Sequence, residues 1–182
     1  MREISLHILD IAENSVNAGS TVVKITINEN LNNDELSIKI EDNGKGMDED
    51  TVRKITDPFV TTRTTRKVGL GIPFLKAAAE ACQGGLEITS APGKGTVISV
   101  KFQHSHIDRM PLGDIQNSLL SLIVGYPDVR WIFSHQVNGK EFLFDTEPVR
   151  EILGEIPFSE PKVIQYLKQT IFQGIDGLTV RN

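Results

Sequence analysis

Hydrophobic and polar positions follow two different periods along the first forty residues. Between residues 3 and 18 the apolar side chains recur every three or four positions, which is the spacing of an amphipathic helix. The segments 22–28 and 36–40 alternate at every second residue, which predicts two strands. The short polar connection 30–34 predicts that these strands form an antiparallel hairpin. Gly19 stands where a glycine commonly ends a helix.

The next sixty residues continue with shorter elements. The pattern predicts a short helix at 48–55, a polar and basic loop at 57–69, a helix at 70–82, and strands at 86–89 and 96–102. Helices that alternate with antiparallel strands in this way pack on one face of a sheet. The predicted fold class is therefore α+β, a two-layer sandwich with a mostly antiparallel sheet.

A second unit is expected after a loosening of the pattern near residue 104. It comprises a helix at 112–124, strands at 129–137 and 140–144 around the hairpin signal Asn138-Gly139, and two last helices. Thr146 and Ser159 are expected to cap those helices, each with a proline in the first turn.

Length supports a division into two parts. At roughly 150 residues per domain, 182 residues correspond to one domain and a small appendage. We expect a main domain at 1–103 and a small α+β module at 104–182. The aromatic residues of the second hairpin are expected to form a separate core for this module, the alternative being a partner-binding face; they are Trp131, Phe133, Phe142 and Phe144.

Composition excludes several classes of protein. A formal charge of −5 argues against a protein that coats nucleic acid, so nucleic acid is not an expected partner. Cys82 is the single cysteine, which excludes an internal disulfide. No apolar run approaches the length of about 18 to 20 residues that spans a bilayer, and the first residues lack the apolar segment of a signal peptide. The expected location is cytoplasmic, without a membrane.

The polar face of the first helix carries an unusual set of side chains, without lysine or arginine: Glu3, His7, Asp10, Asn14 and Asn17. A carboxylate and an amide one turn apart suit Mg²⁺, which prefers oxygen ligands, and the carboxylate is also a candidate general base. The alternative is an ordinary solvated helix face. His7 is open to the same two interpretations, orienting Asp10 or lying on that face.

Two further segments bear on ligand binding. Asp42 ends a predicted strand and is followed by glycines at 44 and 46, which suits recognition of an exocyclic amine such as that of adenine; a simple turn is the alternative. Residues 57–71 combine hydroxyl and basic side chains with Gly69-Leu70-Gly71 before a helix, which favours phosphate. No Walker A spacing is present.

Five segments in order resemble the conserved boxes of the GHKL ATPases, which include gyrase, the ninety-kilodalton chaperones, sensor histidine kinases and mismatch-repair MutL. They are Asp10-Ile-Ala-Glu-Asn14-Ser-Val-Asn17-Ala-Gly19, Asp42-Asn-Gly44-Lys-Gly46-Met, Asp57-Pro-Phe59-Val-Thr-Thr62-Arg63, Gly69-Leu-Gly71-Ile and Gly93-Lys-Gly95-Thr96. The resemblance covers residues 1–103 and implies the Bergerat fold. The first box is closest to MutL, and the later boxes look like a sensor kinase.

The resemblance implies a role for each matching residue. Asn14 would hold Mg²⁺, Asp42 would bind the adenine amine, and Asp10 would activate water, with Glu13 as a second candidate. The remaining nucleotide-binding residues implied by the resemblance are Asn17, Gly44, Gly46, Met47, Thr62, Arg63, Lys67, Gly69, Leu70, Gly71 and Thr96. The implied cofactors are ATP and Mg²⁺.

Two departures from the family keep its activity open. Hydrolytic members carry Glu where this chain has Asp10, so we expect slow ATP hydrolysis. The chain starts at the first box, so we do not expect a complete sensor kinase. The primary hypothesis is an ATPase domain that regulates a protein partner through its C-terminal module. The alternatives are a protein kinase of the anti-sigma-factor serine kinase type and a non-catalytic nucleotide-sensing adaptor. A MutL-like DNA role is disfavoured by the acidity of the chain, and a homo-oligomer is compatible with the sequence.

Overall fold

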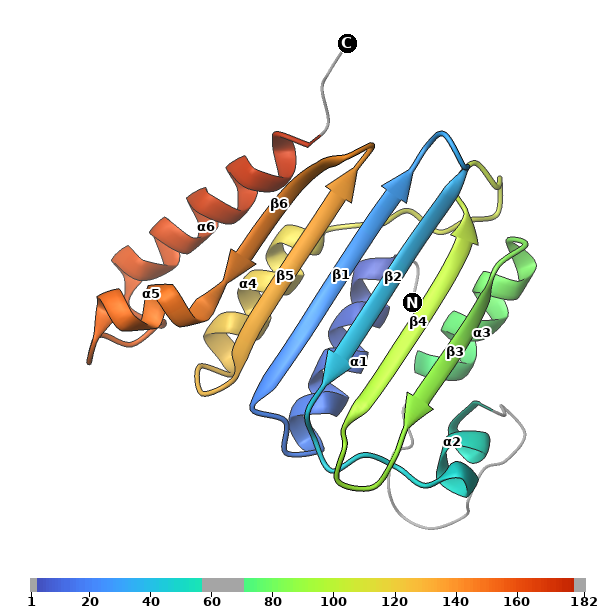
Figure 1. Cartoon of the computed structure of the whole chain (residues 1–182). Coiled ribbons are helices and arrows are strands. Elements are labelled where there is room, and N and C mark those ends of the chain that lie inside the picture. The colour runs from blue at the N-terminus through green and yellow to red at the C-terminus, as the bar shows by residue number, and fades with distance from the viewer. Residues whose placement is uncertain (1–2, 57–70, 179–182) are drawn as a thin grey trace.

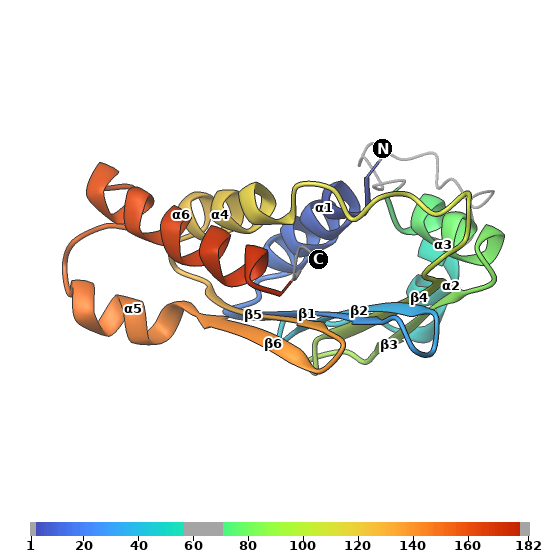
Figure 2. The same cartoon turned by 90° about the horizontal axis from the view of Figure 1, so that it is seen from above.

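The computed structural model describes residues 3–56 and 71–178 and shows one mixed sheet with helices on one face (Figures 1 and 2). The strands are β1 (Val22–Asn30), β2 (Glu35–Asp42), β3 (Gly85–Ser90), β4 (Thr96–Gln103), β5 (Arg130–Val137) and β6 (Lys140–Asp145), in the order β3-β4-β2-β1-β5-β6. Among the strands of the described ranges, only β1 and β5 pair in parallel. The predicted two-layer α+β class is confirmed.

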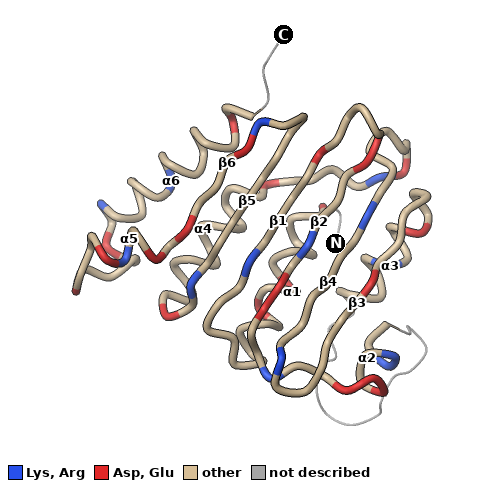
Figure 3. The backbone as a smooth tube through the Cα atoms, in the orientation of Figure 1, with Lys and Arg blue, Asp and Glu red and all other residues tan. Residues whose placement is uncertain are grey.

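The helices are α1 (Ile4–Asn17), α2 (Glu49–Thr56), α3 (Gly71–Ala81), α4 (Ile115–Gly125), α5 (Thr146–Leu153) and α6 (Pro161–Asp176). Figure 2 shows α1, α3, α4 and α6 on the same face of the sheet. Lysine, arginine, aspartate and glutamate positions of both signs are distributed along the strands (Figure 3), and ion pairs join Glu41 with Lys24 and Lys39, and Lys101 with Glu35.

Helix α1 lies across the middle of the covered face. Its apolar stripe, Ile4, Ile8, Ile11 and Ala12, is buried, as the period of the sequence predicts. The Glu3 side chain, which precedes the helix, makes no capping hydrogen bond; Ile4 N–H and Ser5 N–H donate to the carbonyls of Pro111 and Leu112. Gly19 follows its end with φ +80°, a backbone conformation that favours glycine, so the predicted helix end is confirmed.

The segment after residue 104 extends the same sheet and core. Strand β5 pairs with β1 over eight residues, from Val22–Arg130 to Glu29–Val137. Trp131 and Phe133 are fully buried in one cluster with Ile8 and Ile25. The expectation of a separate core for the second hairpin is therefore wrong, because parallel pairing places its inner face beside that of β1. The boundary between residues 1–103 and 104–182 stays a prediction, namely that the two segments have different functions.

The predicted caps of the last two helices are also wrong. Asp145 caps α5, because its side chain accepts the Glu147 N–H, while the Thr146 hydroxyl is buried and accepts the Trp131 N–H at 2.9 Å. Glu160 precedes α6 without a side-chain cap, and Pro161 begins it. At α5 the cap lies one residue before the predicted one, because the Thr146 hydroxyl is engaged in a tertiary contact with the backbone of β5.

Candidate functional site

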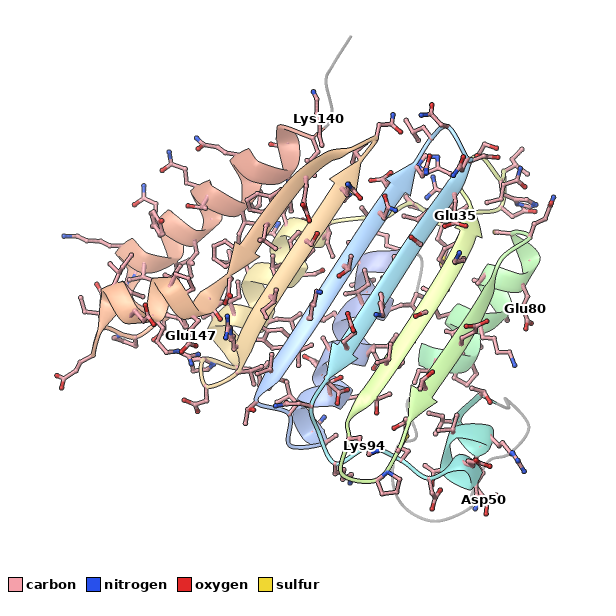
Figure 4. All side chains as sticks on the ribbon, viewed as in Figure 1. Glu35, Asp50, Glu80, Lys94, Lys140 and Glu147 are labelled. Carbon is pink, nitrogen blue, oxygen red and sulfur yellow. The ribbon has the colours of Figure 1, made fainter. Side chains whose placement is uncertain are left out.

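Predicted site residues gather where β2 ends and β4 begins. Asp42, the last residue of β2, is paired with Thr96, the first residue of β4. Figure 4 labels Lys94, in the β3–β4 turn, and Asp50, on α2, at this end of the molecule, whereas Glu35 and Glu80 are labelled toward the opposite end. A cavity of about 660 Å³ lies at that opposite end, beside Asp34, Gly85 and Gln103, and includes none of the predicted residues.

Both carboxylate oxygens of Asp42 are held by neighbouring donors. The Ser15 hydroxyl on α1 donates to Oδ2 at 2.7 Å, and the Gly44 N–H donates to Oδ1 at 2.9 Å. An ionised carboxylate oxygen accepts about two hydrogen bonds, so each retains capacity for an incoming donor. The carboxylate is therefore oriented and still able to bind an amine. Ser15 was not predicted as a site residue, because the helical period places it on the apolar side of the helix.

Close backbone packing explains the glycines around Asp42. A Cβ on Gly46, at φ +66°, would overlap the Ala91 carbonyl, and a Cβ on Gly95, at φ +79°, would overlap the Asp42 carbonyl. A Cβ on Gly44 would approach the Ser20 hydroxyl to 2.6 Å. Gly46 and Gly95 let the 43–47 segment and the β3–β4 turn approach each other directly, and Gly44 lets the same segment approach Ser20.

Ser90 ties this pair of turns together. Its hydroxyl accepts the Met47 N–H at 2.8 Å, donates to the Gly95 carbonyl at 2.9 Å and lies 3.0 Å from the Thr96 hydroxyl. With Ser90 donating to a carbonyl, the Thr96 hydroxyl is the donor in that third contact. The Ser90 hydroxyl therefore holds both the Met47 backbone and the Thr96 side chain in place. Sequence reasoning missed Ser90, for which the only signal was its place at a strand end before the Ala91-Pro92-Gly93 turn.

A second group of residues lies closer to the N-terminus of α1 than Ser15 does. Gly71 begins α3, and a Cβ on it would overlap Oδ2 of Asp10. That oxygen is buried and has no hydrogen-bond partner among the described residues. A buried polar atom without a partner is costly in a native structure and needs a reason. A water molecule or a hydrogen-bond donor of a ligand would provide the missing partner for this oxygen.

His7 is buried, with 2% of its surface exposed, and its Nδ1 lies 3.2 Å from the Gly71 carbonyl. A carbonyl only accepts, so Nδ1 carries the proton and donates. Burial lowers the pKa of His7, and the bond to Gly71 opposes this shift. The interpretation of His7 as a solvated helix-face residue is wrong because α3 covers it.

Helix α1 connects these two groups. Asp10 and Ser15 are five residues apart, about 7.5 Å along a helix axis at 1.5 Å per residue. Asn14 is exposed between them, and Asn17, also exposed, ends the helix. Asp10 and Asn14 place a carboxylate and an amide one turn apart on this side of the helix. Their oxygen atoms are ligands of the kind that Mg²⁺ binds.

A magnesium site here would depend on the nucleotide. Among residues 3–56 and 71–178, no group of three His, Cys, Asp or Glu side chains could hold a metal ion. Mg²⁺ characteristically keeps waters and binds substrate phosphates alongside one or two protein ligands. The donor set of Asn14 and Asp10 fits such shared coordination.

Glu13 points to another part of the fold. Its Oε1 lies 3.4 Å from the Tyr126 hydroxyl, which donates to it, beyond the end of α4. Tyr126 also accepts the Trp131 indole N–H through its carbonyl. Glu13 thus links α1 to the turn before β5, whereas Asp10 faces α3.

Several predicted residues lie outside the described part of the chain. They are Thr62, Arg63 and Lys67 in the predicted polar and basic loop, and Gly69 and Leu70 before α3. Within the described ranges, no helix has the length and apolar character needed to cross a membrane.

Comparison with known proteins gives a match to one family model. The model is described as "Histidine kinase-, DNA gyrase B-, and HSP90-like ATPase" and matches residues 2–106. This span includes every predicted site residue, the loop outside the described ranges among them.

Curated relatives include sensor kinases. The chain is 38% identical over 89 residues to the sensor protein kinase FleS of Pseudomonas aeruginosa, which is 49% of this chain and 22% of that protein. It is 36% identical over 94 residues to the signal transduction histidine-protein kinase AtoS of Escherichia coli, covering 51% and 15%. The chain therefore matches less than a quarter of the length of these relatives.

Solved structures are similar over almost the whole chain. The N-terminal domain of a DNA repair protein aligns with a TM-score of 0.58 at 14% identity, covering 96% of this chain and 57% of that one. The Aquifex aeolicus MutL ATPase domain complexed with ADP aligns with a TM-score of 0.50 at 15% identity, covering 95% and 70%. At such identities the likeness is one of fold, and it extends to most of the segment after residue 104.

Proposed function

We propose that this chain, which belongs to the histidine kinase-, DNA gyrase B- and HSP90-like ATPase family, binds ATP with Mg²⁺ along α1 and hydrolyses it slowly. One observation carries the proposal: α1 contacts both ends of the site, through the Ser15–Asp42 hydrogen bond and the close approach of Asp10 to Gly71. A nucleotide lying along this helix would place adenine at Asp42 and phosphates toward Gly71.

Recognition of adenine rests on the orientation of Asp42. Its carboxylate accepts the exocyclic amine, while Met47, Gly46 and Thr96, from the turns that Ser90 joins, bound the base. A hydrogen bond to a charged acceptor is worth about 1.5–3 kcal/mol, which corresponds to roughly a ten- to hundredfold change in affinity.

Hydrolysis rests on Asp10. Its Oδ2 takes a proton from a water molecule as the water oxygen bonds to the γ-phosphorus. The bond from that phosphorus to the β–γ bridging oxygen then breaks, which releases ADP and phosphate. When bound, Mg²⁺ supplies charge neutralisation at the phosphates, with Asn14 as its protein ligand. The start of α3 offers backbone N–H groups to the same phosphates.

Calorimetric titration of the full chain with ATP, with and without MgCl₂, tests binding. We expect Mg-dependent binding that Asp42→Ala weakens at least tenfold, because the anchored acceptor is lost. Asp128→Ala, at an exposed position in the turn before β5, is the matched control and should bind as the wild type does. ATP binding that changes neither without Mg²⁺ nor in Asp42→Ala would contradict the proposal.

Release of inorganic phosphate tests hydrolysis separately. We expect Asp10→Asn to retain Mg-ATP binding and to lose turnover, since the amide cannot accept the proton from water. Turnover that survives this substitution unchanged would reject Asp10 as the base. A wild type that binds ATP without releasing phosphate would favour the non-catalytic nucleotide-sensing adaptor.

Transfer of phosphate to a protein is a second candidate function. The similarity to FleS and AtoS, which are named as kinases, favours it. Incubation with γ-labelled ATP and candidate partner proteins distinguishes the two reactions. Label on a serine or histidine of the partner would support transfer, and label only in inorganic phosphate would support hydrolysis.

Regulation of a protein partner through residues 104–182 completes the proposal. Support comes from the hydrogen bond between Glu13 and Tyr126, which connects this segment to α1, and from the pairing of β5 with β1. Amide hydrogen exchange with and without Mg-ATP tests the connection. We expect slower exchange at residues 126–137 in the presence of nucleotide, and an unchanged rate there would count against this route.

A further inference from the structure

We infer that His7 is a positioning residue that fixes the start of α3 against Asp10 and so sets the preference of the site for ATP over ADP. The inference rests on the proposed function, because it assumes that phosphates meet α3 at Gly71. His7 itself does not need to touch the nucleotide.

The geometry places Gly71 between two side chains of α1. Its carbonyl accepts the Nδ1 proton of His7 at 3.2 Å, and a Cβ on it would overlap Oδ2 of Asp10 in its present position. His7 and Asp10 are three residues apart, so they lie on the same side of the helix. The hydrogen bond therefore determines where the Gly71 backbone lies relative to the carboxylate.

The protonation state of His7 suits a fixed donor. The imidazole is buried, with 2% of its surface exposed, and burial favours its neutral form. A neutral imidazole has one N–H, and the Gly71 carbonyl selects Nδ1 for it. A neutral His7 with a single N–H group can position the Gly71 backbone, whereas binding phosphate as a cation would need the charged form.

The position along α1 predicts which ligand depends on this contact. Asp42 is held at Ser15, eight residues from His7, or about 12 Å along the helix axis at 1.5 Å per residue. Adenine recognition is therefore remote from the hydrogen bond. In the proposed pose the terminal phosphate is the part of the ligand nearest to Gly71, and it is present in ATP and absent from ADP.

Three variants of the full chain separate positioning from general stability. His7→Leu removes the donor while keeping an apolar volume in the buried site, whereas His7→Asn retains an N–H donor close to the place of Nδ1. His106→Leu makes the same exchange on the segment after β4, where His106 accepts the Asp108 N–H. Calorimetry gives the ATP and ADP affinities of each, and thermal unfolding reports its stability.

We expect His7→Leu to weaken ATP about tenfold, the upper range for one lost hydrogen bond, while ADP changes less than twofold. His7→Asn should restore most of the ATP affinity, and His106→Leu should bind both nucleotides as the wild type does. An unchanged ATP/ADP ratio in His7→Leu, or equal losses for both nucleotides, would overturn the positioning role alone. Failure of the wild type to bind either nucleotide would instead overturn the proposed function and this inference with it.

Discussion

Gly71 and Asp10 approach so closely that a Cβ on the glycine would overlap the carboxylate oxygen Oδ2. This contact joins the start of α3 to α1 at the proposed base. The obstructing atom would be the end of a rotatable side chain, so a substitution at Gly71 is expected to move the carboxylate rather than unfold the protein.

Gly71→Ala tests this consequence. We expect the melting temperature to stay within about 2 °C, because alanine favours a helix and Asp10 can rotate away. Turnover of ATP should fall about tenfold to a hundredfold, since a displacement near 1 Å at a reacting group has an effect of this size.

Gly125→Ala is the matched control for that substitution. It also places a Cβ on a helical glycine, but apart from its chain neighbours and its own helix backbone no atom of the described residues lies within 4 Å of the added carbon. Full turnover in Gly71→Ala would show that the contact has no part in catalysis.

Ser15→Ala removes the donor that holds Oδ2 of Asp42. We predict that ATP affinity falls about three- to tenfold, the range for one hydrogen bond, with turnover at saturation unchanged. Ser121→Ala is the control, because Ser121 on α4 donates to a carbonyl four residues earlier, as Ser15 also does, but is exposed. A calorimetric affinity equal to that of the wild type would mean that Gly44 alone orients Asp42.

Glu29 gives the protein a measurable dependence on pH. Its side chain is 20% exposed and accepts hydrogen bonds from His135 at 2.8 Å and His104 at 2.9 Å. The bond from His135 is the main cause that lowers the pKa of Glu29, and burial opposes it. Because the folded value is the lower one, this group stabilises the fold above pH values of about 4.5, and the contribution is lost as pH falls through the folded pKa.

Urea unfolding between pH 3 and pH 7 measures this contribution. Glu29→Gln should be less stable than the wild type at pH 7 and should lose less stability on acidification. The exposed Glu87→Gln, on β3, is the control and should keep the wild-type slope. Parallel pH profiles for Glu29→Gln and the wild type would contradict the assignment.

Thr146→Val tests the attachment of α5 to β5. The Thr146 side chain is fully buried and accepts the Trp131 N–H, which valine cannot do. Leaving a buried donor unpaired costs about 1–3 kcal/mol, and we predict a loss of unfolding free energy in this range. Thr89→Val, at an exposed position of β3, should change stability by less than about 0.5 kcal/mol in the same urea titration.

Much of the fold could be predicted from local patterns. The spacing of hydrophobic residues predicted the helix at Ile4–Asn17 and the hairpin of β1 and β2, because one side of each element is buried away from water. The candidate site was predicted to the extent that its residues lie in compact motifs such as Asp42-Asn-Gly44. Ser15, Ser90 and the buried state of His7 were missed, since each depends on a segment that is distant along the chain.

The sequence by itself determined the order of the elements, the α+β class and the family, because these follow from periodicity and from motifs a few residues long. Only the tertiary structure decided that β5 joins β1, that α3 buries His7 and that Asp10 lies against Gly71. A helical period shows which side of a helix is apolar but not which segment covers each side. That choice is made when elements far apart in the chain pack together and their buried polar groups find partners.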